Sequence, residues 1–223
     1  METKKNIADV RKIGLLFLAS ILLIGSSNCG KKKATTPEKS VQEITAEGWK
    51  LFESDNFTDA KPKFSEAITK DINYADAYNG RGWCNAFIDL DDEAISDFNA
   101  ANTKDLDKPD AHVGLGGIFL ANQEFTSAIT SAQAALFMDS TYQFSHKISI
   151  NYLDLHLILA QAFYGLGGAY FDSAQQEVDY LNPINNLNPA DSKTWVVNGV
   201  TYGTYAEALL KEIQRLEESI GGY

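Results

Sequence analysis

Few side chains of this sequence are placed to do chemistry. The three histidines, His112, His146 and His156, lie far apart and have no cysteine or carboxylate at metal-ligand spacing, so no metal site is expected. No serine or cysteine stands in a recognisable nucleophile elbow. The sequence therefore predicts a protein that is not an enzyme and that carries no cofactor.

Two acidic clusters and one glycine-rich run have structural explanations. The clusters are Asp89, Asp91, Asp92 and Glu93, and Asp105, Asp107 and Asp110. Neither has the glycine and the spaced glutamate of a calcium loop, so we expect them to be solvated charges at helix N-termini. The glycine-rich run at 165–168 follows an expected helix and lacks the lysine of a phosphate loop. It therefore indicates a helix end and a turn.

Two tryptophans at a fixed interval favour binding over catalysis. The interval between Trp49 and Trp83 recurs in several series of small residues and in a pair of phenylalanines. The series are Gly48, Gly82 and Gly116; Ala60, Ala94 and Ala128; Ala67, Ala101 and Ala135; and Phe64 and Phe98, with Ala132 at the third place of that series. Such a period indicates a repeat array. Identical places in the repeat mean that the two indoles should project in parallel from neighbouring helices.

Within each unit the spacing indicates two helices joined by a short polar turn. In the first unit, four residues follow the i, i+4, i+7, i+8 pattern that gives a helix one buried face. They are Ala60, Phe64, Ala67 and Ile68. The small residues Gly48 and Ala60 would let the two helices approach closely, and Phe64 would fill the space beyond them.

This pattern resembles the tetratricopeptide repeat, in which W-x2-L-G-x2-Y, A-x3-F and P recur with a period of about 34 residues. The second unit matches best, at Tyr78, Gly82, Ala94, Phe98 and Ala101. The resemblance implies an all-α fold, an α-α superhelix (a solenoid) of helix-turn-helix repeats. It also implies that the first helix of each unit lines a concave groove that binds a protein or peptide partner.

The first helices carry the residues that we expect in this groove. They are Trp49, Phe52, Asn79, Trp83, Phe87 and Phe163. Two interpretations remain open, because the rings either form an aromatic strip that holds a peptide or pack between adjacent units as ordinary core. Aromatic strips also stack on sugars, so capture of a glycan or nutrient for an uptake system is the alternative function.

A fourth unit is expected out of phase with the others. Its small and aromatic residues keep the internal spacing of the repeat; they are Ala162, Phe171, Ala174 and Val178. However, the interval from Gly116 to Ala162 exceeds the period by twelve residues, which places an insertion of that length around 142–154. The first helix of this unit is expected over 148–165 and the second over 171–181.

The period changes after Pro189. Asn198 and Gly199 stand between valine-rich runs and predict a small β-hairpin, because both residues tolerate positive φ. Thr204 and Glu207 form a capping box ahead of a helix that should cap the array. Its apolar stripe is Leu209, Leu210, Ile213, Leu216 and Ile220, and its polar face is Lys211, Glu212, Arg215 and Glu218.

The N-terminal segment resembles a bacterial lipoprotein signal. Four basic residues precede an apolar run at 13–24, and a small polar stretch leads to Cys29. As a helix the run would reach about 18 Å, short of the ~30 Å hydrocarbon core of a bilayer, which favours a cleaved signal over a permanent span. The resemblance implies that Cys29 is lipidated. Gly30 after the cysteine resembles sorting to an outer membrane, with the protein facing the periplasm.

Charge and cysteine content narrow the remaining classes of function. The chain has a net charge of −11, which disfavours nucleic acid as a partner. It has two cysteines, so if Cys29 carries lipid, Cys84 has no disulfide partner and is expected in the core.

The expected organisation of the whole chain follows from these segments. The segments are 1–28, a signal peptide; 29–40, the lipidated cysteine and a flexible tether; 41–142, three repeats at 41–74, 75–108 and 109–142; 143–188, the displaced fourth repeat; and 189–223, the hairpin and capping helix. The predicted function is a non-catalytic, membrane-tethered adaptor for cell-envelope assembly. Because the repeated residues report packing, function is expected where the units differ, at Trp49, Trp83 and the inserted segment.

Overall fold

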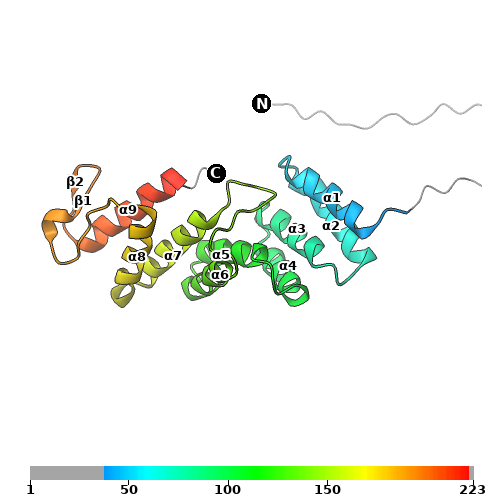
Figure 1. Cartoon of the computed structure of the whole chain (residues 1–223), viewed down its shortest axis with the longest axis horizontal. Helices are drawn as coiled ribbons and strands as arrows, with labels where there is room; N and C mark the ends of the chain where they lie inside the picture. Colours follow the sequence, from blue (N-terminus) through cyan, green and yellow to red (C-terminus); the bar gives the residue numbers. More distant parts are fainter. Residues whose placement is uncertain (1–37, 221–223) are drawn as a thin grey trace, which may run out of the picture. The chain divides into compact units, whose positions relative to one another are not determined.

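The structure is a computed structural model that describes residues 38–220, and most of those residues lie in paired helices (Figure 1). The predicted signal peptide, the lipidated Cys29 and most of the tether lie outside the described residues, as do 221–223. The helices are α1 (Val41–Phe52), α2 (Phe57–Lys70), α3 (Ala75–Ala86), α4 (Asp91–Lys104), α5 (Asp110–Ala121), α6 (Phe125–Met138), α7 (Tyr152–Leu166), α8 (Phe171–Leu181) and α9 (Tyr205–Ile220), with single 3₁₀ turns at η1 (Gly168–Tyr170) and η2 (Ser192–Thr194).

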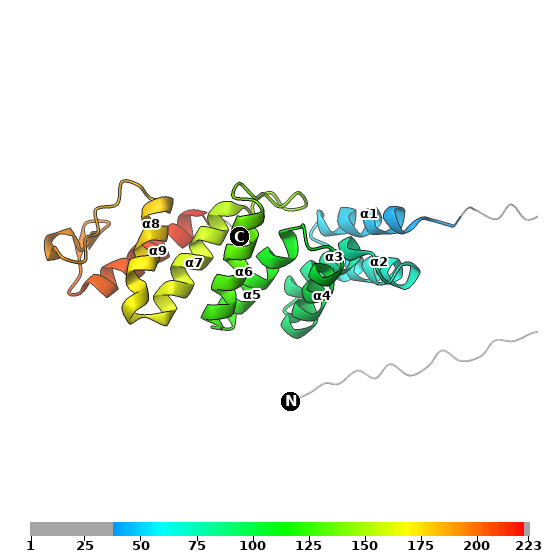
Figure 2. The same cartoon turned by 60° about the horizontal axis from the view of Figure 1, so that its bottom comes forward.

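Within residues 38–220, helices α1 to α8 form four consecutive pairs, which follow one another along the long axis in Figures 1 and 2. In each pair the first helix packs on the second, and the second helix packs on the first helix of the next pair. The first helices α3, α5 and α7 also contact one another in order, and α9 packs on α7 and α8 at the end. The predicted solenoid of helix-turn-helix repeats, closed by a hairpin and a capping helix, is confirmed.

Close packing at the glycines explains the repeated glycine and phenylalanine. The ring of Phe64 lies so near Gly48 and Gly80 that a Cβ on either would stand 2.8 Å and 2.3 Å from it. Phe98 lies in the same way between Gly82 and Gly114, at 2.8 Å and 2.4 Å. Each phenylalanine therefore joins the first helix of its own repeat to the first helix of the next, and only glycine leaves room for the ring.

The turn inside each of the first three repeats uses a left-handed residue at one fixed place. Asp55, Asp89 and Gln123, which occupy the same position in successive repeats, have φ of 56°, 58° and 60°. This region is strained for most side chains, although aspartate is among the residues that tolerate it best. The predicted turns are confirmed, and the period extends to a backbone conformation as well as to packing.

The insertion in the fourth repeat is a loop of residues 139–151, which we call the inserted loop, between α6 and α7. The helix predicted over 148–165 begins later than expected, at Tyr152. Asn151 caps it, since its side chain accepts a hydrogen bond from the Leu153 N–H and its own N–H donates to Asp154. Ile150 belongs to the loop instead, because its carbonyl accepts from the Phe144 N–H at 2.9 Å. The second helix, α8, has the predicted bounds.

The C-terminal segment forms the predicted hairpin and helix. Strands β1 (Val196–Val197) and β2 (Val200–Thr201) pair antiparallel, and both turn residues between them have positive φ. Thr204 and Glu207 make the predicted capping box at the start of α9. One prediction here is wrong: Glu212, expected on the polar outer face, is only 4% exposed. It accepts hydrogen bonds from Asn182 and Arg215, which compensate its burial.

None of the helices in residues 38–220 is both long and apolar enough to span a membrane.

Candidate functional site

The predicted groove residues lie on the first helices, but most are inaccessible. Trp49 and Trp83 are 5% and 6% exposed, and Phe52 and Asn79 are also buried. The half-buried residues are Phe87 and Phe163. Trp49, Phe52, Trp83 and Phe87 belong to one aromatic cluster. Phe163 on α7 is separate from it, since its described ring partner is Tyr170.

The inserted loop covers the two tryptophans. Phe144 is fully buried, stacks on Trp83 at a centroid distance of 4.6 Å, and meets Trp49 edge-on at 5.9 Å. The His146 ring stacks on Trp49 at 3.8 Å with an angle of 2° between the planes, and its Nδ1 lies 2.8 Å from Glu53 Oε1. The loop therefore reaches back over the groove of the first two repeats, as its path in Figures 1 and 2 shows.

A lysine completes the contact between the loop and the first two repeats. Lys147 Nζ donates to Asp55 Oδ1 at 2.8 Å and lies 5.0 Å from the centre of the Phe87 ring and 5.8 Å from that of Phe57. Phe57 and Phe87 are themselves stacked at 4.6 Å. An ammonium over an aromatic pair and beside a carboxylate combines cation–π attraction with an ion pair. This part of the groove thus already holds an aromatic side chain and a basic side chain, both from the chain itself.

The base of the loop is fixed by a buried polar contact. The Tyr142 hydroxyl donates to Asp110 Oδ1 at 2.8 Å, and the Asn79 side-chain amide lies 3.4 Å from Asp110 Oδ2. Burial raises the pKa of Asp110 and, together with the Asp110 charge, raises that of Tyr142 well above its usual range. Neutral Tyr142 therefore remains a hydrogen-bond donor at any physiological pH.

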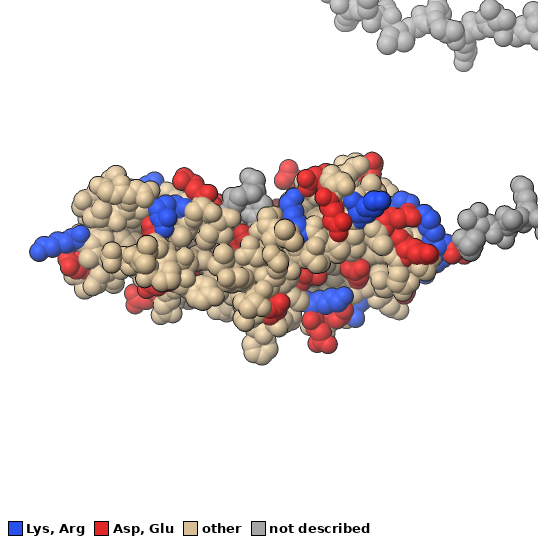
Figure 3. Space-filling view, turned by 45° about the horizontal axis from the view of Figure 1, so that its top comes forward, with Lys and Arg blue, Asp and Glu red and all other residues tan. Residues whose placement is uncertain are grey.

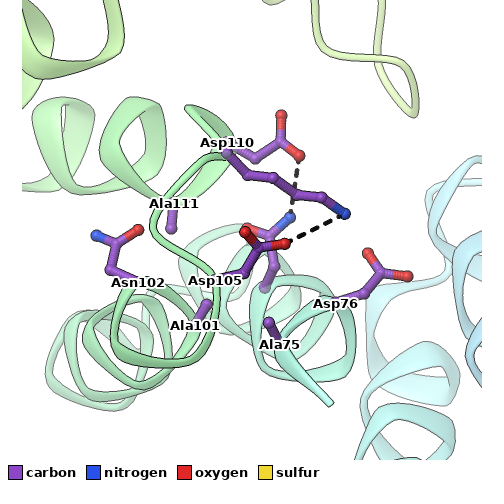
Figure 4. Close-up of a pocket in the computed structure, with 9 residues that line it drawn as sticks. Ala75, Asp76, Ala101, Asn102, Asp105, Asp110 and Ala111 are labelled. Atoms are coloured by element: carbon purple, nitrogen blue, oxygen red, sulfur yellow. Dashed lines mark hydrogen bonds and ion pairs between the residues drawn. The ribbon is translucent and has the colours of Figure 1, made fainter. Parts of the chain in front are cut away.

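Figure 4 shows Asp76, Asp105 and Asp110 around a pocket beside this contact. Its volume is about 10 Å³, which is room for about one water molecule. Asn79 lines the pocket, and its buried Oδ1 has no hydrogen-bond partner among the described residues. The predicted site residue Asn79 therefore supports the loop through Asp110.

An open cleft lies beside the covered region. It has a volume of about 500 Å³, and α3, α5 and α7 supply most of its wall. The lining residues are Trp83, Ala86, Phe87, Asp89, Asp91, Val113, Gly114, Gly117, Ile118, Leu120, Ala121, Ile150, Asp154, Leu157, Ile158, Gln161 and Glu217. Of the predicted residues, Trp83 and Phe87 belong to it. In the view of Figure 3, charged side chains gather over the first repeats, and the middle of the molecule is mostly uncharged.

The cleft exists because a glycine replaces tryptophan in the third repeat. Gly117 stands one full repeat after Trp83, at the place that Trp49 and Trp83 occupy in the first two repeats. It is exposed, and a Cβ built on it would have nothing within 4 Å. The missing indole leaves the space between α3 and α7 open. The repeat period could have revealed this glycine, because Gly117 occupies the tryptophan position of the third repeat. The prediction considered only the aromatic residues and did not consider the repeat that lacks one.

The residues considered for chemistry take structural places. His156 Nδ1 lies 2.6 Å from Glu177, and the His156 ring stacks on Tyr180. Burial lowers the pKa of His112. Within residues 38–220 no group of three histidine, cysteine or acidic side chains is placed to hold a metal ion.

Cys84 is buried as predicted, and burial raises the pKa of its thiol to about 12. A thiol that stays protonated is a poor nucleophile. The predicted helix end at 165–168 is also confirmed, because Gly167 follows α7 with a φ of 67°.

Comparisons with known proteins agree with this architecture. The model of the tetratricopeptide repeat family matches residues 92–142. Among solved structures, YrrB, described as a TPR protein with an unusual peptide-binding site, has a TM-score of 0.56 at 16% identity, over 78% of this chain and 85% of YrrB. MamA has a TM-score of 0.54 at 20% identity, over 79% of this chain and 97% of MamA.

A third similar structure is PilW, described as a widely conserved type IV pilus biogenesis factor. Its TM-score is 0.53 at 16% identity, over 65% of this chain and 64% of PilW. The search of curated proteins finds no significant match. Since these identities are low, the structural likeness concerns the fold. It shows that the described part of this chain has the fold of a tetratricopeptide-repeat solenoid, and residues 92–142 also match the family model.

Proposed function

We propose that this protein is a non-catalytic adaptor that holds a segment of another protein in the cleft between α3, α5 and α7. The supporting observation is that the concave face already binds one polypeptide segment, the inserted loop, through Phe144 on Trp83 and Lys147 beside Asp55. The adjoining cleft of about 500 Å³ has the same kind of wall and is open. An apolar groove with a few polar groups at its edge suits recognition of a peptide segment.

The alternative, capture of a glycan or nutrient, depends on aromatic faces that are free to stack on sugar rings. In this structure His146 covers a face of Trp49 and Phe144 covers a face of Trp83. The described residues therefore favour a protein partner.

The cellular setting is part of the proposal. We propose that Cys29, which lies outside the described residues, carries lipid and tethers the solenoid to a membrane of the cell envelope. The expected site is the outer membrane, where the protein would face the periplasm. Assembly of envelope structures is the context that we favour. The likeness of fold to PilW, described as a pilus biogenesis factor, supports this choice by analogy.

Site-specific photo-crosslinking in the native envelope tests the adaptor function. A photoreactive amino acid replaces Leu120, which is half-buried in the wall of the cleft, or Gln133, which is exposed on α6 and does not line the cleft. We expect discrete protein adducts from position 120 and none of the same adducts from position 133. Identical adducts at both positions, or none at position 120, would argue against binding in the cleft.

Replacing Cys29 with serine should release the protein from membranes without unfolding it, because the thioether to the lipid cannot form. Lipid anchorage is measured by fractionation of cells, and folding by circular dichroism of the purified protein. Cys84→Ala is the control that keeps Cys29 and should stay with the membrane. If C29S also remains in the membrane fraction, the apolar run at 13–24 is an uncleaved anchor and the lipid tether is wrong.

A further inference from the structure

We propose that the cleft recognises a basic segment of its partner, in which an apolar side chain and a lysine or arginine stand three residues apart, with the cation bound at Asp89. This inference rests on the proposed adaptor function. It adds the chemistry of the partner, and three features of the described residues carry it.

The first feature is the charge around the cleft. Four carboxylates, Asp89, Asp91, Asp154 and Glu217, are among its described lining residues, and no lysine, arginine or histidine is among them. Asp89, Asp91 and Glu217 form no ion pair or side-chain hydrogen bond with any residue in 38–220. Asp89 lies in the turn after α3, Asp91 is the first residue of α4, and Glu217 lies on α9. A segment lying across α5 and α7 would therefore meet negative charge on both sides, which favours a cationic ligand.

The second feature is the equivalence of Asp55 and Asp89. They occupy the same position in successive repeats, and each is the left-handed residue of its turn, with φ of 56° and 58°. Asp55 already binds a cation, since Lys147 Nζ lies 2.8 Å from its carboxylate. Asp89 presents the same group on the same turn one repeat later, at the edge of the open cleft. Asp89 therefore has the same repeat position and backbone conformation as Asp55, which binds an ammonium group.

The third feature is the spacing that the inserted loop uses. Phe144 is buried against Trp83, and Lys147, three residues later, reaches Asp55 and the Phe87 ring. One repeat later, Gly117 takes the place of Trp83 at the floor of the cleft. The space that an indole would fill there is empty of side chains from residues 38–220. A partner segment with an apolar side chain in that space and a basic side chain at Asp89 would repeat the arrangement of the loop.

Binding of synthetic peptides to the purified protein tests this inference. The probe is a fluorescent peptide with phenylalanine and lysine three positions apart in a glycine–serine background, and the matched peptide has glutamate in place of lysine. Fluorescence anisotropy should show that the lysine peptide binds at least about tenfold more tightly and that salt weakens its binding.

Two pairs of variants locate the site. Gly117→Trp places in the third repeat the tryptophan of the first two repeats, and it should abolish binding. Gly117→Ala also replaces the helical glycine but does not fill the space, so it should retain binding. Asp89→Asn keeps a residue that tolerates positive φ and should weaken binding about three- to fivefold, as loss of one exposed ion pair does. Asp92→Asn, an exposed acid that does not line the cleft, should change nothing.

The outcomes separate this inference from the adaptor function. If both peptides bind equally and Gly117→Trp blocks both, the cleft binds segments but selection of basic side chains is overturned. If D89N binds the lysine peptide as the wild type does, the assignment of Asp89 is overturned. If neither peptide binds, the inference fails, and crosslinking from position 120 decides the adaptor function independently.

Discussion

Replacing Phe98 with alanine should lower the free energy of unfolding by about 3–5 kcal/mol, the usual range for a buried phenylalanine. The ring is fully buried, lies against Gly82 and Gly114, and meets Trp83 edge-on at 5.5 Å. These contacts join two neighbouring repeats, so the cavity would open at the interface on which the array depends. Urea denaturation followed by circular dichroism measures the change.

The matched control is Phe137→Ala. Phe137 lies near the end of α6 and is 93% exposed, so its replacement should change the free energy of unfolding by no more than about 0.5 kcal/mol. A loss below about 1 kcal/mol for F98A, or equal losses for the two variants, would contradict the packing of Phe98 between the glycines.

The fold could be predicted because each repeat obeys the same packing rule. The glycines at 48 and 82, with Phe64 and Phe98 at matching places, report a close approach that is local and recurs, so three units in register suffice to identify the solenoid. The C-terminal hairpin was equally readable, because Asn198 and Gly199 adopt the positive φ that the turn requires.

The groove was harder to predict, because a non-periodic segment fills part of it. The period correctly placed Trp49 and Trp83 on neighbouring first helices, but it carried no information on residues 143–151 of the inserted loop, which have no counterpart in the other repeats. The contact of Phe144 and His146 with the two indoles joins residues more than sixty positions apart along the chain. Such a contact depends on where the loop falls in space, and neither hydropathy nor spacing encodes that.

The start of α7 illustrates the same limit on a smaller scale. Apolar residues from Ile148 onward favour a helix when they are considered alone. Asn151 provides a better cap, and Ile150 is drawn into the core by the loop, so the helix begins at Tyr152. Tertiary burial decides the boundary here, whereas the sequence pattern determines only that a helix exists.

Replacing Phe144 with alanine should uncover the two tryptophans and cost about 3 kcal/mol of stability, at the low end for a buried phenylalanine because a loop relaxes more readily than a helix. Phe144 is the fully buried residue of the inserted loop that contacts Trp49, Phe52 and Trp83 together. Its loss would let water reach both indoles, so tryptophan emission should shift to longer wavelength while the far-ultraviolet circular dichroism of the helices is kept.

Ile148→Ala is the matched control, since Ile148 belongs to the same loop and is 69% exposed. It should leave both emission and stability unchanged. If F144A also leaves the emission unchanged, the loop does not cover the tryptophans in solution. With the expected result, the uncovered face of Trp83 would join the open cleft, because Trp83 also lines the cleft. The inserted loop would then set where the groove begins, and the variant should bind longer segments than the native protein does.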